Sequence, residues 1–125
     1  MPKINLVSDS RSYLGVKVPA SAAINKGEVV VQNGVFTFTF DTYGAADERI
    51  LIYAGAKIRV DAQAATTEIG AENFAILDKV YWDAGAAKIT KVVGANTYVG
   101  RALENKNFVG GVVLGNSLLI DQFVL

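Results

Sequence analysis

The 125-residue chain contains no cysteine and no histidine. Without cysteine it has neither a disulfide framework nor thiolate chemistry. Without histidine it lacks the commonest general base near neutral pH and the commonest metal ligand. The two absences exclude the usual zinc sites, and any nucleophilic catalysis would need a lysine or carboxylate base.

Charge is also scarce, since charged residues make up only 19% of the chain and 12 basic residues balance 12 acidic ones. A protein that binds nucleic acid by neutralising phosphates normally carries a basic excess, so we expect no nucleic-acid partner. No apolar run approaches the roughly 20 residues of a membrane-spanning helix. Residues 1–15 lack the apolar core of a signal peptide. We therefore expect a soluble protein, made in a cytoplasm, with no membrane partner.

The sequence offers no catalytic or cofactor motif. It has no Ser-x-x-Lys spacing, no Gly-x-Ser-x-Gly elbow and no Asp-x-Asp-x-Asp-Gly calcium loop. The pair Gly110-Gly111 lacks the lysine that a phosphate-binding loop requires. Most of the carboxylates that could form an acid–base pair fall in predicted turns, where Asp is usually a solvated turn former: Asp41, Asp47, Glu48, Asp78 and Asp83. We expect no enzyme activity, no cofactor and no metal.

What the chain has in excess is apolar residues, at 51%. They could all belong to the core, or some could form surface that is buried in an assembly. The low charge favours the assembly slightly, and both alternatives stay open.

The clearest strand pattern lies at residues 35–40, after an Asn33-Gly34 pair that predicts a two-residue hairpin turn. Side chains alternate along a strand, so three aromatic residues share one face: Phe36, Phe38 and Phe40. Such a stripe is typical of a core or a subunit interface, and a ligand platform is the less common alternative. We take the stripe as the candidate subunit interface. Residues 47–54 could begin a helix or form a strand, and their β-branched content favours the strand.

Residues 78–104 predict three strands joined by two compact turns. Val80 and Trp82 point to one face of the first strand, and Ile89 lies in the second. These three residues and Phe74 are the predicted core anchors. Residues 71–77 are the best helix candidate, of two turns at most, with Phe74 and Leu77 packed on one side.

The two ends of the chain differ. Residues 1–14 have no sustained period, which indicates an extended arm, and a frayed terminus with no role stays open as an equal alternative. Residues 109–125 are almost wholly apolar and predict either a hairpin or one kinked strand, with the C-terminus tied into a sheet. The predicted fold is therefore mainly β: one small domain over residues 15–125, like a β-barrel or β-sandwich, with an N-terminal arm over residues 1–14 and at most one short helix.

The amino-acid sequence of residues 78–104 resembles that of a widespread family of tailed-phage capsid decoration, or cement, proteins. The resemblance rests on Asp-x-Val-Tyr-Trp-Asp at residues 78–83, Lys-Ile-Thr at 88–90 and Val-Gly-Arg-Ala-Leu at 99–103. Weaker similarities lie upstream at residues 27–30, 34–36 and 55–58. One departure is Leu77, where the family usually has glycine, because a leucine disfavours positive φ.

The resemblance implies a non-enzymatic protein that binds the outside of an icosahedral phage head, commonly as a homotrimer. Its partner would be the major capsid protein, whose neighbouring subunits it would tie together to stabilise the shell. It would be made in the cytoplasm of the host bacterium and reside on the outer capsid surface of the virion. Three residues of the arm are the candidate capsid contacts: Asp9, Arg11 and Tyr13.

Two other classes remain as alternatives. One is a receptor- or carbohydrate-binding β-module on the virion surface, for which the Phe stripe and Trp82 would form an exposed platform. The other is a small hydrolase that uses turn carboxylates.

Overall fold

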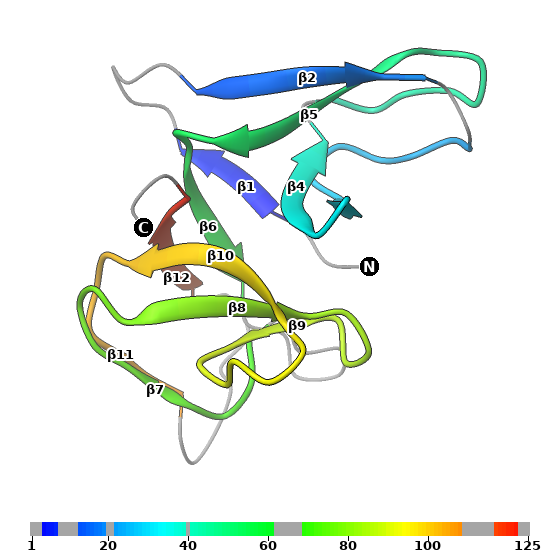
Figure 1. Ribbon diagram of the computed structural model, residues 1–125. Coiled ribbons are helices and arrows are strands. Elements are labelled where there is room, and N and C mark those ends of the chain that lie inside the picture. The colour runs from blue at the N-terminus through cyan, green and yellow to red at the C-terminus, as the bar shows by residue number, and fades with distance from the viewer. Residues whose placement is uncertain are drawn as a thin grey trace.

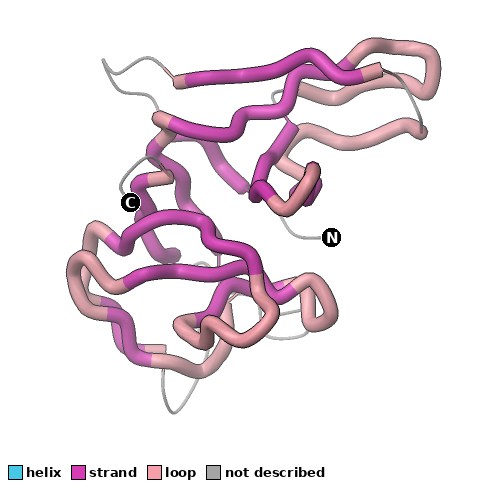
Figure 2. The backbone as a smooth tube through the Cα atoms, viewed as in Figure 1, coloured by secondary structure: helices cyan, strands magenta, loops and turns pink. Residues whose placement is uncertain are grey.

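The computed structural model describes residues 4–7, 13–19, 22–39, 41–61, 69–108 and 117–122, and for residues 4–7 it describes the backbone alone. Within these ranges the chain forms strands, turns and bends, with no helix. Figure 2 shows this pattern of strands and connecting loops. The mainly β fold predicted from the sequence is confirmed.

The larger sheet has six antiparallel strands and occupies the lower part of Figure 1. Its central strands come from distant parts of the sequence, since Leu118 stands opposite Val60 and Arg101 opposite Asp121. In spatial order the strands are β1 (Ile4–Val7), β6 (Lys57–Asp61), β12 (Ser117–Asp121), β10 (Thr97–Ala102), β8 (Lys79–Asp83) and β9 (Lys88–Thr90).

A second antiparallel sheet of four strands lies above it in Figure 1. Its order is β2 (Leu14–Val18), β5 (Arg49–Ala54), β4 (Val35–Thr39) and β3 (Val29–Gln32). The predicted Asn33-Gly34 turn joins β3 to β4, and both residues have positive φ, as such hairpins require. A short pair, β7 (Asn73–Phe74) with β11 (Lys106–Asn107), lies at one end of the larger sheet.

The chain passes from the smaller sheet to the larger one at Gly55, between β5 and β6. Gly55 has a φ of 81°, which glycine adopts without the steric cost of a side chain. Gln122 holds this corner, because its backbone N–H donates to the Ala56 carbonyl at 2.9 Å and its Nε2 donates to the Ile52 carbonyl at 3.2 Å. The two sheets thereby share one core and are sandwich-like, without closing into a barrel.

The shared core joins side chains from both sheets. Trp82 of β8 packs edge-to-face on Phe36 of β4, with ring centroids 6.0 Å apart, and Phe74 does the same with Phe108 at 6.0 Å. The structure buries each of the four residues expected to anchor the core: Phe74, Val80, Trp82 and Ile89.

The Phe stripe, expected at a subunit interface, lies in the core of the protomer where it is described. Phe36 and Phe38 are buried inside the protomer, where Phe36 meets Trp82, so they are not available as a subunit interface. The prediction was wrong for these two residues because the six-stranded sheet, which the pattern of a single strand does not reveal, packs over them. Phe40 lies outside the described residues.

The prediction of a short helix at residues 71–77 is also wrong. The segment forms strand β7 and a turn, and Leu77 is exposed, not packed beside Phe74. An isolated helix of two turns is marginal, and here backbone donors find partners outside the segment. The N–H of Ile76 donates to Asn105 Oδ1 at 2.9 Å, and the N–H of Leu77 donates to the Ala102 carbonyl at 2.7 Å.

Part of the predicted N-terminal arm belongs to the body. Residues 4–7 form β1, which pairs with β6 along its whole length. At the other end, β12 lies between β6 and β10, inside the larger sheet, so this part of the apolar C-terminal region is tied into a sheet. Residues 109–116, over which a hairpin or a kink was expected, lie outside the described residues.

Candidate functional site

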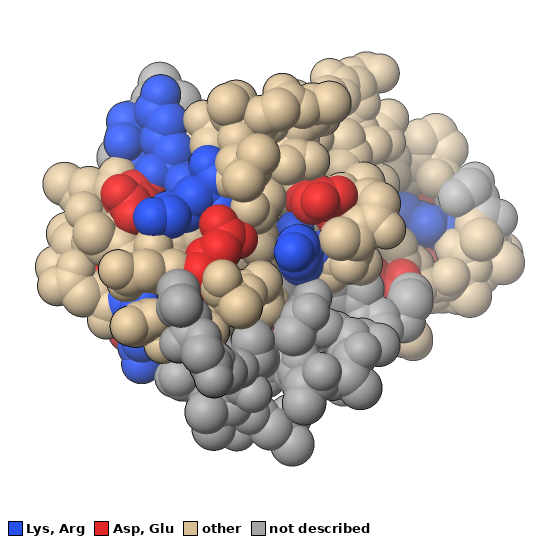
Figure 3. Space-filling view, turned by 90° about the horizontal axis from the view of Figure 1, so that it is seen from below, with Lys and Arg blue, Asp and Glu red and all other residues tan. Residues whose placement is uncertain are grey.

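No reaction centre is evident in the described part of the chain. It contains no group of three or more His, Cys, Asp or Glu side chains that could hold a metal ion. It also contains no helix long and apolar enough to cross a membrane. Basic and acidic side chains lie interspersed on the face shown in Figure 3, with no broad field of one sign. This face has no broad basic patch of the kind that attracts a polyanion.

The exposed apolar side chains are the more informative feature, and the first group lies on the four-stranded sheet. Paired residues of neighbouring strands share a face, as do residues two apart in one strand. The pairs Val16–Leu51 and Leu51–Thr39 therefore place Val16, Tyr53 and Val35 on the face opposite the core. We call these three residues the outer sheet face.

The outer sheet face is apolar, and it is the exposed rim of a face whose centre is covered, since Leu51, Thr37 and Thr39 are 0%, 2% and 1% exposed. Val16, Val35 and Tyr53 are 44%, 47% and 40% exposed. The two threonines of this face offer no free hydroxyl proton, because Thr37 Oγ1 donates to the Val30 carbonyl at 2.6 Å and Thr39 Oγ1 donates to the Asn25 carbonyl at 2.8 Å. An uncharged surface of this kind is suited to burial against another protein.

Strand β2 adds a backbone edge to this face. It is the last strand of its sheet in the described fold, with β5 on one side, and it runs along the top of Figure 1. Tyr13 and Leu14, at its start, are also exposed. An apolar edge strand offers unpaired backbone donors and acceptors to a partner.

A second exposed apolar group lies at the other end of the molecule, in the turn that joins β7 to β8 (Figure 1). Ile76 and Leu77 are each 54% exposed, and we call them the 76–77 tip. Leu77 has a φ of 70°, the left-handed conformation that costs a non-glycine residue roughly 1–2 kcal/mol. The position keeps the positive φ that a glycine would favour, contrary to our expectation for a leucine.

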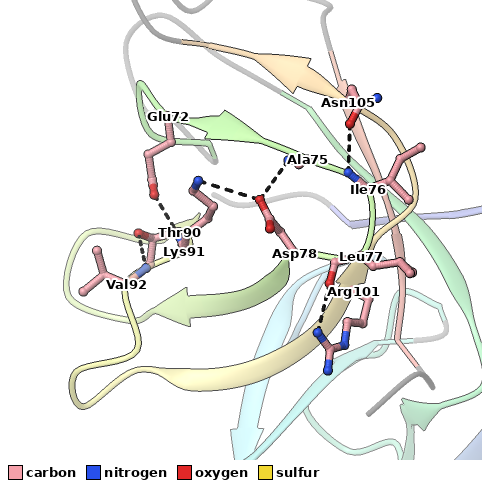
Figure 4. Close-up of polar contacts among 10 residues, drawn as sticks. All are labelled: Glu72, Ala75, Ile76, Leu77, Asp78, Thr90, Lys91, Val92, Arg101 and Asn105. Carbon is pink, nitrogen blue, oxygen red and sulfur yellow. Dashed lines mark hydrogen bonds and ion pairs between the residues drawn. The ribbon is translucent and has the colours of Figure 1, made fainter.

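The turn beneath the tip is held by a dense polar network, shown in Figure 4. The Asp78 N–H donates to the Ala75 carbonyl at 3.0 Å, and Asp78 Oδ2 accepts from the Ala75 N–H at 2.8 Å. Arg101 Nη1 donates to the Leu77 carbonyl at 2.9 Å. Ile76 and Leu77 extend away from the network in this view. The tip is therefore a fixed apolar projection.

The loop at residues 91–96 lies beside this turn and exposes Val92 and Val93 at 63% and 59%. Lys91 connects the two, since its Nζ lies 3.7 Å from Asp78 Oδ2 and its N–H donates to Glu72 Oε1 at 2.9 Å. Two neighbouring loops thus present apolar side chains over a polar base.

The residues singled out from the sequence coincide little with these surfaces. Of the candidate capsid contacts, Tyr13 is exposed beside β2, whereas Asp9 and Arg11 lie outside the described residues. Sequence reasoning missed the outer sheet face and the 76–77 tip. The adjacent Ile-Leu and Val-Val pairs beside turn residues were the one available signal for the tip and the loop.

An all-β protein with apolar surface at two separate places belongs, on these grounds, among proteins that act by contact with other proteins. The family comparison makes this specific, because the model for the phage cement protein family matches residues 7–115. The chain belongs to the phage cement protein family. Neither the curated proteins nor the solved structures contain a significant match. Membership of this family implies binding to the phage capsid as part of the virion, in a structural role.

Proposed function

We propose that the protein is a capsid decoration protein that binds the outer surface of a phage head as a homotrimer. It stabilises the shell by bridging neighbouring subunits of the major capsid protein, and it has no catalytic activity. The host bacterium makes it in the cytoplasm before it joins the head. The observation that carries this proposal is the family match over residues 7–115.

The distribution of apolar surface supports a bridging role. A bridge must contact at least two partners, and the two exposed apolar regions lie far apart, with β2 at the top of Figure 1 and the turn before β8 at the lower left. The balanced charge also suits a protein that packs beside copies of itself, since it removes strong electrostatic repulsion between them.

Stabilisation by binding needs no exceptional residue. A ligand that binds only the assembled state contributes RT ln(1 + [L]/Kd), about 2.7 kcal/mol at a hundredfold excess over Kd. One such contribution is modest. Repeated at many sites over a shell whose subunits must separate together, it opposes the internal pressure of packaged DNA.

The alternative of a receptor- or carbohydrate-binding module loses its specific support. The platform expected for it was the Phe stripe with Trp82, and Trp82 is only 5% exposed while Phe36 and Phe38 are 2% exposed. The described surface therefore does not offer these rings to a sugar.

The test is to strip the protein from heads of its own phage and to measure the temperature at which DNA is released, with and without the protein added back. We expect the release temperature to rise on addition. Equal release temperatures would remove the stabilising role and leave a display function as the better interpretation. A protein that does not rebind at all would contradict the decoration role itself.

A further inference from the structure

We propose that the 76–77 tip is a preorganised anchor that inserts into an apolar recess of a major capsid subunit. This inference rests on the proposed function and deepens it by naming the residues of one contact. It would be particular to this chain and its own head, because the resembled family usually has glycine at the position of Leu77.

The first argument is the unusual conformation of Leu77. Three non-glycine residues in the described ranges have positive φ, namely Asn33, Leu77 and Ala87. Asn33 is a residue type that tolerates this conformation, and Ala87 packs against the core. Leu77 has neither reason, since more than half of its side chain faces solvent. A strained, exposed leucine that glycine would relieve indicates a role outside the folding of the protomer.

The second argument is rigidity. All the backbone N–H groups of residues 75–78 donate to a named partner, and the Leu77 carbonyl accepts from Arg101. The ion pair of Asp78 with Lys91 joins the turn to the neighbouring loop. Binding through a turn that is already fixed loses little conformational entropy, which is the main gain of preorganisation.

The surroundings of the tip indicate the chemistry of the partner. Lys79, the second residue after the tip, is exposed and stands opposite Arg101, so two positive charges face each other across β8 and β10. Like charges at opposed positions destabilise a sheet unless a further group relieves them. On its other side Arg101 stands opposite the buried Asp121 of β12, which leaves Lys79 as the charge that faces solvent. The expected recess is apolar with a carboxylate at its rim.

The tip alone is too small to form a stable interface with any protein. A stable interface between two proteins buries roughly 800 Å² on each partner, far more than two half-exposed aliphatic side chains supply. The tip is therefore an anchor within a larger contact. Such contacts concentrate their binding energy in a few well-fitted side chains.

The decisive variant is Leu77→Gly, tested for both folding and binding. Glycine relieves the strain at positive φ, so we expect the denaturation midpoint to rise while the affinity for stripped heads falls by about tenfold or more. Ile76→Ser should weaken binding in the same way. Leu77→Met, which keeps an apolar side chain, should retain most of the affinity. Val92→Ala is the control, because Val92 is an exposed apolar residue of the adjoining loop, at 63% against 54% for Leu77, and it should bind as the unaltered protein does.

Each outcome separates the anchor from the proposed function. If the unaltered protein binds heads and Leu77→Gly binds equally well, the anchor is overturned and the decoration role stands. If Leu77→Gly lowers both stability and binding, the leucine serves the fold and the inference fails. If Leu77→Gly changes the mass of the free protein in sedimentation, the occupant is a second copy and the inference is again overturned. If the unaltered protein does not bind, the proposed function fails first.

Discussion

The two sheets use their outward faces differently. In the six-stranded sheet, burial alternates along β6 and β8, and β6 places Lys57, Arg59 and Asp61 outward between the buried Ile58 and Val60. In the four-stranded sheet the outward positions include Val16, Val35 and Tyr53, and no residue of β2 is fully buried. Strand β6 thus has a charged exterior, whereas the rim of the smaller sheet presents apolar side chains on the face opposite the core.

The difference shows which surface is adapted to water. Outward charges of the larger sheet meet partners within the chain, as Arg59 does with Glu104 at 3.4 Å and with Ser117 Oγ at 3.2 Å. The outer sheet face has no such partners to satisfy, and its threonine hydroxyls are already bonded to carbonyl groups. Both sheets supply the shared core, and only the rim of the smaller one leaves apolar side chains exposed opposite it. Substitutions that stay within one region should separate folding from assembly.

The largest effect on folding is expected from Trp82→Ala. Trp82 joins the two sheets through its contact with Phe36, and it is 5% exposed. Truncating a buried tryptophan typically costs about 3–5 kcal/mol. Chemical denaturation should show this loss, whereas Val92→Ala, a truncation of an exposed side chain, should stay within about 0.5 kcal/mol. A loss below about 1 kcal/mol for Trp82→Ala would mean that the two sheets do not depend on this contact.

Gly100→Ala should have the next largest effect on folding. A Cβ at Gly100 would lie 2.1 Å from the Asp121 carbonyl oxygen, so β10 and β12 could not keep their present approach. Overpacking of this kind costs about 1–3 kcal/mol, because the contact is with backbone and must be relieved by moving a strand. Gly85→Ala is the control, since its nearest neighbour would be Asp83 Oδ1 at 3.5 Å. Equal denaturation midpoints for the two variants would contradict the close strand packing.

Local patterns in the sequence predicted the parts of the fold that depend on local chemistry. The Asn33-Gly34 turn and the three strands between residues 79 and 102 follow from turn residues and alternation. The pairing of β1 and β12 with β6 did not follow, because it joins segments far apart in the chain. For the same reason the Phe stripe could be read as an interface, since nothing near it in the sequence reveals the sheet that covers it.

The candidate site was harder to predict than the fold. Val16, Val35 and Tyr53 look like ordinary strand residues, and they become a surface only when the register shows which face is opposite the core. The Ile-Leu pair hinted at exposure, but the positive φ of Leu77 could not be predicted, because leucine normally avoids it and the turn is held by Asn105 and Arg101 from other segments. Tertiary contacts set the exposure and the backbone conformation of such residues.

The smallest effect on folding, and the sharpest contrast between the sheets, is expected from Val16→Lys. The side chain is 44% exposed on an edge strand, so the free energy of unfolding should change by no more than about 0.5 kcal/mol. A lysine on an edge strand opposes pairing with another chain, and a charge on the outer sheet face would have to lose its water on burial. We therefore expect the variant to scatter light as a 13.3 kDa protomer under conditions where the unaltered protein forms a trimer. Val92→Lys places the same charge on an exposed valine outside the four-stranded sheet, and it should leave the assembly intact. A Val16→Lys protein that still forms trimers would move the contact between copies away from the outer sheet face, and a large loss of stability would show that β2 belongs to the protomer's core after all.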